Sequence, residues 1–234
     1  NNVQYGSNSN ITDDGSSLFY NSNGGSGSNS FEFSWNNINE QIMFKELFKD
    51  CINIESASFT NFETKIITDM ESMFKNCKAL VSIPLIDTGN VTNMDSMFLG
   101  CTSLTTVPAL KTSNVTIMYG MFSACSSLSV APDFDTSSVT NMDYIFSRCT
   151  SLLKIPNDNY GNVTRISNGF RQCTGITVIP NMNLTSVTRM SETFLECRNI
   201  ESGALALYNQ VSTKQTIPEH YQIEIGRASC RERV

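Results

Sequence analysis

The cysteines are the residues of this sequence best suited to chemistry, and their spacing is regular. Six of them, from Cys77 to Cys197, fall 24 residues apart, and Cys51 precedes Cys77 by 26. A nucleophilic thiol needs a neighbouring base and an accessible, electropositive setting, and a zinc ion needs converging ligands. The single histidine, His220, lies outside this series. We therefore expect no catalytic residue and no metal.

Three arrangements of these thiols are open: buried reduced groups, disulfides between neighbouring repeats, or metal ligands. A disulfide framework has irregular spacings in a short chain, whereas these cysteines share one repeat position and predict a stacked column. We favour buried, reduced thiols that act as small hydrophobic groups. The sequence also contains no P-loop, dinucleotide fingerprint or elbow serine, so we expect no enzyme and no cofactor.

Other residues keep the same 24-residue period and must position the cysteines. A phenylalanine lies three residues before each cysteine and Leu or Ile three residues after it, and prolines and valines recur with the same period. A fixed period of this length predicts a solenoid. "SLTTVP" is typical of a short parallel strand ended by proline, "DTSSVTNM" of a turn, and "DSMFLGC" of a short α or 3₁₀ segment. The predicted fold is an α/β repeat solenoid, with a parallel sheet of short strands and short helical turns opposite it.

Composition excludes two classes of partner. The net charge is -6 and the pI about 4.8, and the basic residues are scattered, which argues against nucleic acid. No apolar run approaches the roughly 18 to 20 residues of a membrane span. The chain begins at Asn1 without an apolar leader, so we expect a processed or trimmed protein.

The chain divides into four predicted parts. Residues 1–38 are rich in Gly, Ser and Asn, with a capping hairpin formed by "SLFY" and "FEFSW". Residues 39–201 form the solenoid and begin with a capping helix, and residues 202–224 form a final capping helix with Leu205, Leu207 and Tyr208 buried. One DNA string that encodes "EIGRASCRERV" is, after its first base, a common sequencing adapter. Residues 225–234 are therefore expected to be an artefact of gene assembly from a metagenomic contig.

The repeat carries a family resemblance. "NVTNMDSMFLGCTSLTTVP" resembles the repeat of the BspA-like leucine-rich repeat proteins of bacterial surfaces, mycoplasma lipoproteins and gut phages, over about residues 41–200. The resemblance implies a right-handed leucine-rich-repeat-like solenoid that binds a ligand at a cell surface or virion and has no catalytic activity. Asp158 and Gly169 occupy positions where the repeat is apolar and predict one irregular coil.

Candidate binding residues are those that should point outward from the strands, together with the tyrosines expected to be exposed. Small Thr, Ser and Val residues suit either a plain scaffold or a recognition surface, and tyrosine favours interfaces. The candidates are Thr105, Thr106, Ser129, Lys154, Thr177, Tyr119, Tyr144 and Tyr160.

Two other polar patterns are expected to be structural. The "NVT" triplets at Asn90, Asn114 and Asn162 match a glycan acceptor pattern, but they fall in the repeated turn. Aspartates at positions 87 and 135 could bind calcium, yet Lys111 interrupts their column and the six oxygens that calcium needs are lacking.

The expected function is adhesion or ligand recognition at the surface of a gut bacterium. The partner would be a host or microbial surface protein or a glycan, in a cell-surface or extracellular location. The alternatives are a phage structural or receptor-binding protein in the virion, and a passive structural spacer.

Overall fold

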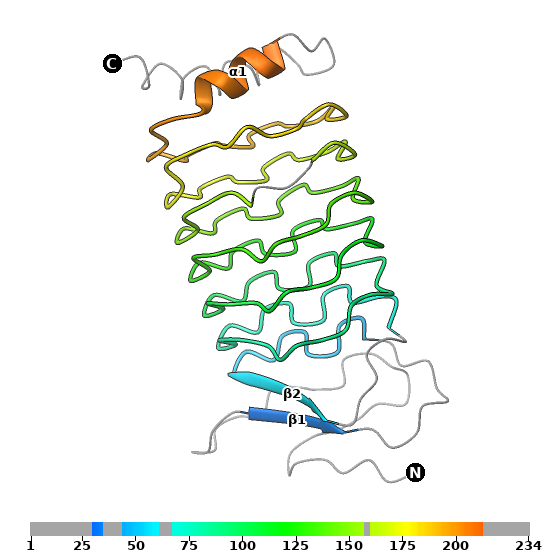
Figure 1. Ribbon diagram of the computed structural model, residues 1–234. Helices are drawn as coiled ribbons and strands as arrows, with labels where there is room; N and C mark the ends of the chain where they lie inside the picture. The colour runs from blue at the N-terminus through cyan, green and yellow to red at the C-terminus, as the bar shows by residue number, and fades with distance from the viewer. Residues whose placement is uncertain (1–29, 35–43, 61–66, 157–159, 213–234) are drawn as a thin grey trace.

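A computed structural model describes residues 30–34, 44–60, 67–156 and 160–212 of the chain. The coils stack into one elongated column between the strands β1 (Ser30–Ser34) and β2 (Ser56–Thr60) at one end and the helix α1 (Ala204–Ser212) at the other (Figure 1). Coils are joined at a 24-residue offset: the Thr92 N–H donates to the Thr68 carbonyl and the Thr116 N–H to that of Thr92, both at 2.9 Å. The predicted repeat solenoid is confirmed.

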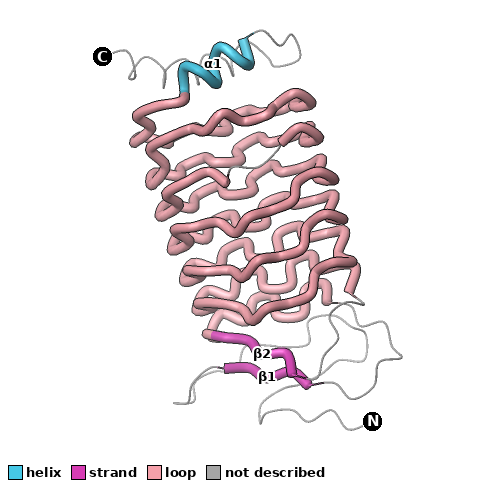
Figure 2. The backbone as a smooth tube through the Cα atoms, viewed as in Figure 1, coloured by secondary structure: helices cyan, strands magenta, loops and turns pink. Residues whose placement is uncertain are grey.

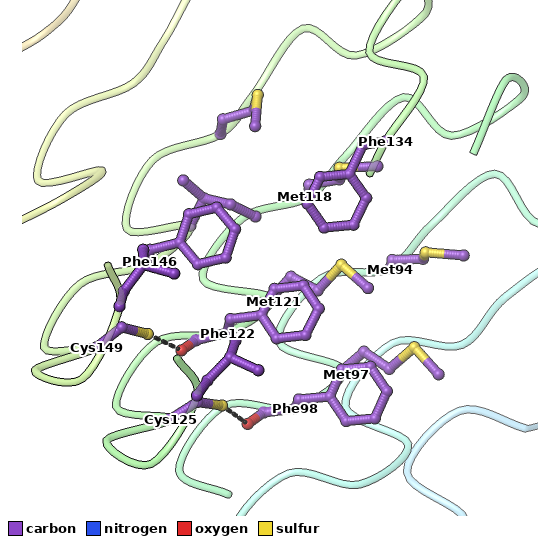
Figure 3. Close-up of a cluster of buried hydrophobic side chains, with 14 of the residues drawn as sticks. Met94, Met97, Phe98, Met118, Met121, Phe122, Cys125, Phe134, Phe146 and Cys149 are labelled. Carbon is purple, nitrogen blue, oxygen red and sulfur yellow. Dashed lines mark hydrogen bonds between the residues drawn. The ribbon is translucent and has the colours of Figure 1, made fainter. Parts of the chain in front are cut away.

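The interior is a set of side-chain columns that run the length of the stack. Stacked phenylalanine rings, with centroids 5.2 to 5.8 Å apart, extend from Phe48 to Phe194. Methionines pack beside them, and the cysteines form a parallel column (Figure 3). Because every coil adds one member to each column, hydrophobic burial couples a coil mainly to its neighbours.

The Met-Phe segment is a chain of turns, not the short helix predicted. Along residues 94–101, the N–H groups of Met94, Ser96 and Phe98 donate to the next coil, while that of Met97 donates to the Met94 carbonyl. Ser96 has a φ of 56° and Gly100 one of 79°, which a right-handed helix cannot contain. We call this segment, and its equivalent in each coil, the turn ladder; Figure 2 shows the coils as loop and turn throughout.

The predicted sheet of short strands is also not confirmed. Around "SLTTVP", the Thr105 N–H donates to the Val81 carbonyl at 3.0 Å, but no strand is assigned there, and β1 and β2 form the only sheet in the described part of the chain. Most of the isolated parallel bridges lie instead two residues after the repeated valine of each coil. One example joins Asn93, which follows Val91, to Ile117 in the next coil. Proline lacks an N–H and interrupts pairing in the extended segment.

The N-terminal end differs from the predicted hairpin and capping helix. β1 pairs in parallel with β2, with Phe31 opposite Ala57, whereas "SLFY" lies outside the described residues. Residues 44–51 form the first turn ladder: the Glu46 N–H donates to the Glu71 carbonyl at 2.8 Å, and Glu46 has a φ of 62°. The apolar spacing of this segment repeats that of residues 94–101, which explains why it resembled a helix.

At the other end, α1 lies over the last coil. Ala204, Leu207 and Val211 are buried, whereas Leu205 and Tyr208, predicted to be buried with Leu207, are only partly so. The helix follows a glycine at position 203 with a φ of 90°, where a Cβ would lie 1.9 Å from a backbone oxygen. Residues 213–234, which include the expected adapter segment, lie outside the described residues.

Candidate functional site

The candidate residues of the predicted strands form two neighbouring columns, which we call the extended face. It consists of the pairs Val81–Ser82, Thr105–Thr106, Ser129–Val130, Leu153–Lys154 and Thr177–Val178. Backbone hydrogen bonds join some of the coils here: the Thr105 N–H donates to the Val81 carbonyl at 3.0 Å and the Leu153 N–H to the Ser129 carbonyl at 3.1 Å. The structure therefore brings Thr105, Thr106, Ser129, Lys154 and Thr177 onto one surface, with Ser129 partly buried and the others exposed.

Aliphatic side chains on the extended face were not among the candidate residues. Four of them are strongly exposed: Val81 (46%), Val130 (67%), Leu153 (58%) and Val178 (52%). The signal was present in the sequence, because they occupy the same two columns as the polar candidates, but an outward valine is also ordinary on a β surface. Together they add apolar side chains to a face that otherwise carries small polar residues and one lysine.

Of the three candidate tyrosines, two lie together on another part of the coil. The rings of Tyr119 and Tyr144 are in contact, with centroids 5.5 Å apart and planes tilted by 57°. Tyr144 is 37% exposed, and Tyr119 is partly buried. Both belong to the turn ladder, so the structure does not place them on the extended face.

The prediction that Tyr160 is exposed is wrong. It is 1% exposed, and its hydroxyl donates to the Pro156 carbonyl at 3.0 Å. Earlier coils place buried threonines in this column, including Thr88 and Thr136, so the position is internal throughout. Asp158, which the sequence predicts to interrupt the apolar pattern of this coil, lies outside the described residues.

Charged groups flank the tyrosine pair. Tyr119 lies between Asp95 and Asp143 in one column: the Ser96 N–H donates to the Tyr119 carbonyl, and the Gly120 N–H to that of Asp143, both at 2.8 Å. Burial raises the pKa of the Tyr119 hydroxyl, and the neighbouring Tyr144, Asp95 and Asp143 raise it further. Arg165 acts in the opposite direction and lowers this pKa, so charges of both signs lie near the partly buried ring.

An ion pair lies beside the tyrosines. The Asp143 side chain is 4% exposed; its Oδ2 accepts from Arg165 Nε at 2.8 Å and Nη2 at 2.5 Å, and its Oδ1 accepts the Ser167 N–H at 2.6 Å. The carboxylate is therefore fully used within the fold. The Arg165 side chain is 39% exposed and retains N–H groups toward solvent.

The cysteine column is confirmed as buried, free thiols. Each thiol from Cys77 to Cys197 donates to the carbonyl of the phenylalanine in the preceding coil, as from Cys125 Sγ to Phe98 O at 3.1 Å (Figure 3). Burial raises the pKa of Cys101 and Cys149 to about 12. A nucleophilic cysteine needs a lowered pKa, so the environment of these thiols opposes catalysis.

The remaining polar candidates serve the turns. The Asn114 side chain donates to the Gly89 carbonyl at 2.7 Å, and Asn162 donates in the same way to Ser137. Lys111 Nζ lies 3.0 Å from the carboxylate of the aspartate in the preceding coil. Within the described ranges, no group of three His, Cys, Asp or Glu side chains could hold a metal ion.

Stacked 24-residue coils, with a continuous interior column and an exposed extended face, define a leucine-rich-repeat type of solenoid. Residues 41–154 and 103–208 match the family model DUF285, described as a Mycoplasma protein of unknown function. The chain belongs to this family, the BspA-like repeat family, and the resemblance stated from the sequence is confirmed. No curated protein matches the chain.

One of the similar solved structures supports the fold, with a TM-score above 0.5. A leucine-rich repeat protein from Eubacterium ventriosum is 18% identical with a TM-score of 0.53, over 80% of this chain and 47% of that one. A leucine rich cell surface protein from Faecalibacterium prausnitzii is 18% identical, over 83% and 52% of the two chains, with a TM-score of 0.46. A leucine-rich repeat protein of T. pallidum is 15% identical, over 89% and 94%, with a TM-score of 0.41. This chain spans about half the length of the first two.

Among the residues that the structure describes, none belongs to a helix long and apolar enough to cross a membrane.

Proposed function

We propose that this chain is a non-enzymatic recognition module of a cell-surface adhesin, and that it binds a protein partner through the extended face. The observation that carries this proposal is the presence of four exposed aliphatic side chains on that face. Exposed apolar groups that gather on one surface are typical of protein interaction sites, and solenoids use their long surfaces for binding. A surface location is supported by the Faecalibacterium structure, which is described as a cell surface protein.

The extended face combines apolar and polar side chains. This mixture favours a folded protein as the partner over an unstructured polymer. Val130 and Leu153 contribute apolar area, whereas Thr105, Thr106 and Lys154 contribute hydroxyl and ammonium groups. A polar frame around apolar anchors is the usual composition of a non-obligate interface. Because inter-coil hydrogen bonds fix the backbone, little conformational entropy is lost on binding.

The test is binding of the chain to host matrix proteins, mucin and intact gut bacteria. The double variant Val130→Lys/Leu153→Lys should weaken binding to a protein partner at least about tenfold, because it places charge in the centre of the contact. Leu85→Lys is the matched control: it removes an aliphatic side chain that is 76% exposed but outside both columns.

Three results would contradict this proposal. If Val130→Lys/Leu153→Lys bound the partner as tightly as Leu85→Lys does, the extended face would not be the binding surface. Binding to bacterial cells alone would favour a phage receptor-binding protein, and failure to bind any of these partners would favour a passive spacer.

A further inference from the structure

In the turn ladder, the backbone hydrogen bonds between coils all run in one direction. From the ladder that begins at Met70 to the one that begins at Ile166, every second N–H group donates to a carbonyl of the following coil, at 2.7 to 3.1 Å. The Phe170 N–H, for example, donates to the Thr193 carbonyl at 2.9 Å. One edge of each ladder therefore presents hydrogen-bond donors, and the opposite edge presents acceptors.

The last ladder, residues 190–197, has no following coil among the described residues. Within that part of the chain, its four corresponding N–H groups have no acceptor. They belong to Met190, Glu192, Phe194 and Glu196, and we call this row of donors the open edge. Because the peptide groups of the stacked ladders are aligned, their dipoles give the open edge a partial positive charge, as at the N-terminus of a helix.

The helix α1 covers a different part of the last coil. Its Gln210 side chain donates to the Met182 carbonyl at 2.8 Å, in the segment that precedes the last ladder. Phe194 stacks on Phe170 at 5.3 Å but is only partly buried, whereas the phenylalanines of the other ladders are fully buried. Since Phe48 at the opposite end is among the buried ones, the phenylalanine column is accessible only beside the open edge.

One positive side chain at the open edge lacks a charge partner. Arg189 is exposed, and within the described residues it makes no ion pair. It forms a parallel bridge with Arg165 of the preceding coil. Arg165 is neutralised by Asp143, but the residue equivalent to Asp143 in the next coil is Ser167, which carries no charge. An acidic group beside Arg189 would therefore be stabilised.

The two acidic side chains of the open edge are held by the preceding coil. Glu192 Oε2 lies 2.6 Å from Arg171 Nη1, and Glu196 Oε2 accepts from Gln172 Nε2 at 2.8 Å. Both carboxylates are thus bonded within the stack. They do not neutralise Arg189.

We propose that the open edge binds an acidic peptide segment of a partner protein, which lies along the last ladder as one further rung. The backbone carbonyls of the peptide accept from the four free N–H groups, as the carbonyls of each following coil do inside the stack. Apolar side chains of the peptide cover the Phe194 ring. An acidic side chain lies opposite Arg189, where a cross-strand pair of opposite charge is favourable.

The chain itself supplies a probe for this site. Residues 69–76, "DMESMFKN", belong to the second ladder, and their carbonyls accept from the first. Asp69 lies in the same bridge column as Arg189, so a synthetic peptide of this sequence places a carboxylate opposite Arg189 when it adds to the ladder in register. The control peptide carries Asp69→Lys/Glu71→Lys and keeps every apolar residue.

The test titrates the full chain with both peptides and follows amide hydrogen exchange by NMR. In the free chain, the four open-edge amides should exchange faster than the bonded amides of the preceding ladder, and the acidic peptide should slow them. Arg189→Glu should raise the Kd for the acidic peptide at least about threefold and lower it for the lysine peptide. Arg148→Glu is the matched control: it reverses an exposed charge in an inner ladder and should leave both Kd values unchanged.

The proposal is wrong if the acidic peptide does not bind saturably, or binds without slowing exchange at the open edge. It is equally wrong if Arg189→Glu and Arg148→Glu give the same Kd. Slow exchange of these amides without peptide, increasing with protein concentration, would identify a second copy of the chain as the occupant instead. Val130→Lys/Leu153→Lys should leave peptide binding intact, so this site and the extended face fail independently.

Discussion

The phenylalanine column should carry more stability at its centre than at its end. Phe122 is fully buried, and its ring lies against Phe98 at 5.3 Å, Phe146 at 5.5 Å and Phe134 at 5.8 Å. Replacing a buried phenylalanine by alanine costs about 3–5 kcal/mol, and each ring pair contributes about 0.5–1.5 kcal/mol beyond burial. With three ring neighbours, Phe122→Ala should lower the free energy of unfolding by about 4–5 kcal/mol.

Phe194→Ala is the matched control, since it makes the same substitution at the same repeat position. Phe194 is only partly buried and stacks on one ring, Phe170, at 5.3 Å. Its loss should cost about 2–3 kcal/mol, because less area is uncovered and one ring pair is broken. For a chain of this size, the difference of about 2 kcal/mol corresponds to a gap in Tm of roughly 4–8 °C.

Urea unfolding followed by circular dichroism measures both variants, with the midpoint and slope fitted separately. A smaller slope for Phe122→Ala would be consistent with loss of coupling between the two halves of the stack, as expected for nearest-neighbour stabilisation. Equal destabilisation by the two substitutions would refute the argument that burial and ring contacts along the column determine stability.

Three further predictions concern polar and thiol groups. In a Cys230→Ser background, the seven described thiols should not react with Ellman's reagent at pH 8 until urea is added, because burial raises their pKa. Thr112→Val should cost about 1–3 kcal/mol in thermal unfolding, since its buried hydroxyl bonds both the N–H and the carbonyl of Asp135, whereas exposed Thr116→Val should cost under about 0.5. Asp143→Ala should cost about 2 kcal/mol, less than a fully buried pair because its arginine is 39% exposed.

The period of the sequence was sufficient to predict the solenoid and its columns. A residue that recurs every 24 positions must occupy equivalent places in successive coils, so the burial of Phe98 and Cys101 followed directly. The local conformation did not follow. Apolar residues at positions 94, 97, 98 and 101 fit one face of a helix, yet they also fit a ladder of turns. Backbone hydrogen bonds to the next coil favour the ladder of turns over the helix. The sequence of a single coil does not show whether its N–H groups will bond within the coil or to the next one.

The exposure of the candidate binding residues was predicted correctly where it was derived from the 24-residue repeat. It was predicted wrongly for Tyr160, which was chosen by residue type. Thr105 and Thr177 lie on the face expected for them because the 24-residue register fixes both. Tyr160 was misplaced because it was judged by residue type; the same register would have assigned it to the buried column of Thr88 and Thr136. Alignment of the chain with itself is thus a better guide to burial here than hydrophobicity.

The same register shows which departures the fold tolerates. In a stack whose coils share one pattern, a residue that matches its column is explained by folding, whereas one that departs from it has to be explained by its own surroundings. Tyr160 departs but is buried and hydrogen-bonded, so packing accounts for it. Ile117 is exposed and lacks the oxygen with which Asn93 and Asn141 cap the turn, but Arg165 and Arg189 lack it as well. Tyr144 has a φ of 62°, and Glu192 at the equivalent position has one of 54°. Because bonds to the next coil fix the backbone of the turn ladder, the ladder accepts varied side chains at these positions, and a departure from the column does not by itself identify a binding residue.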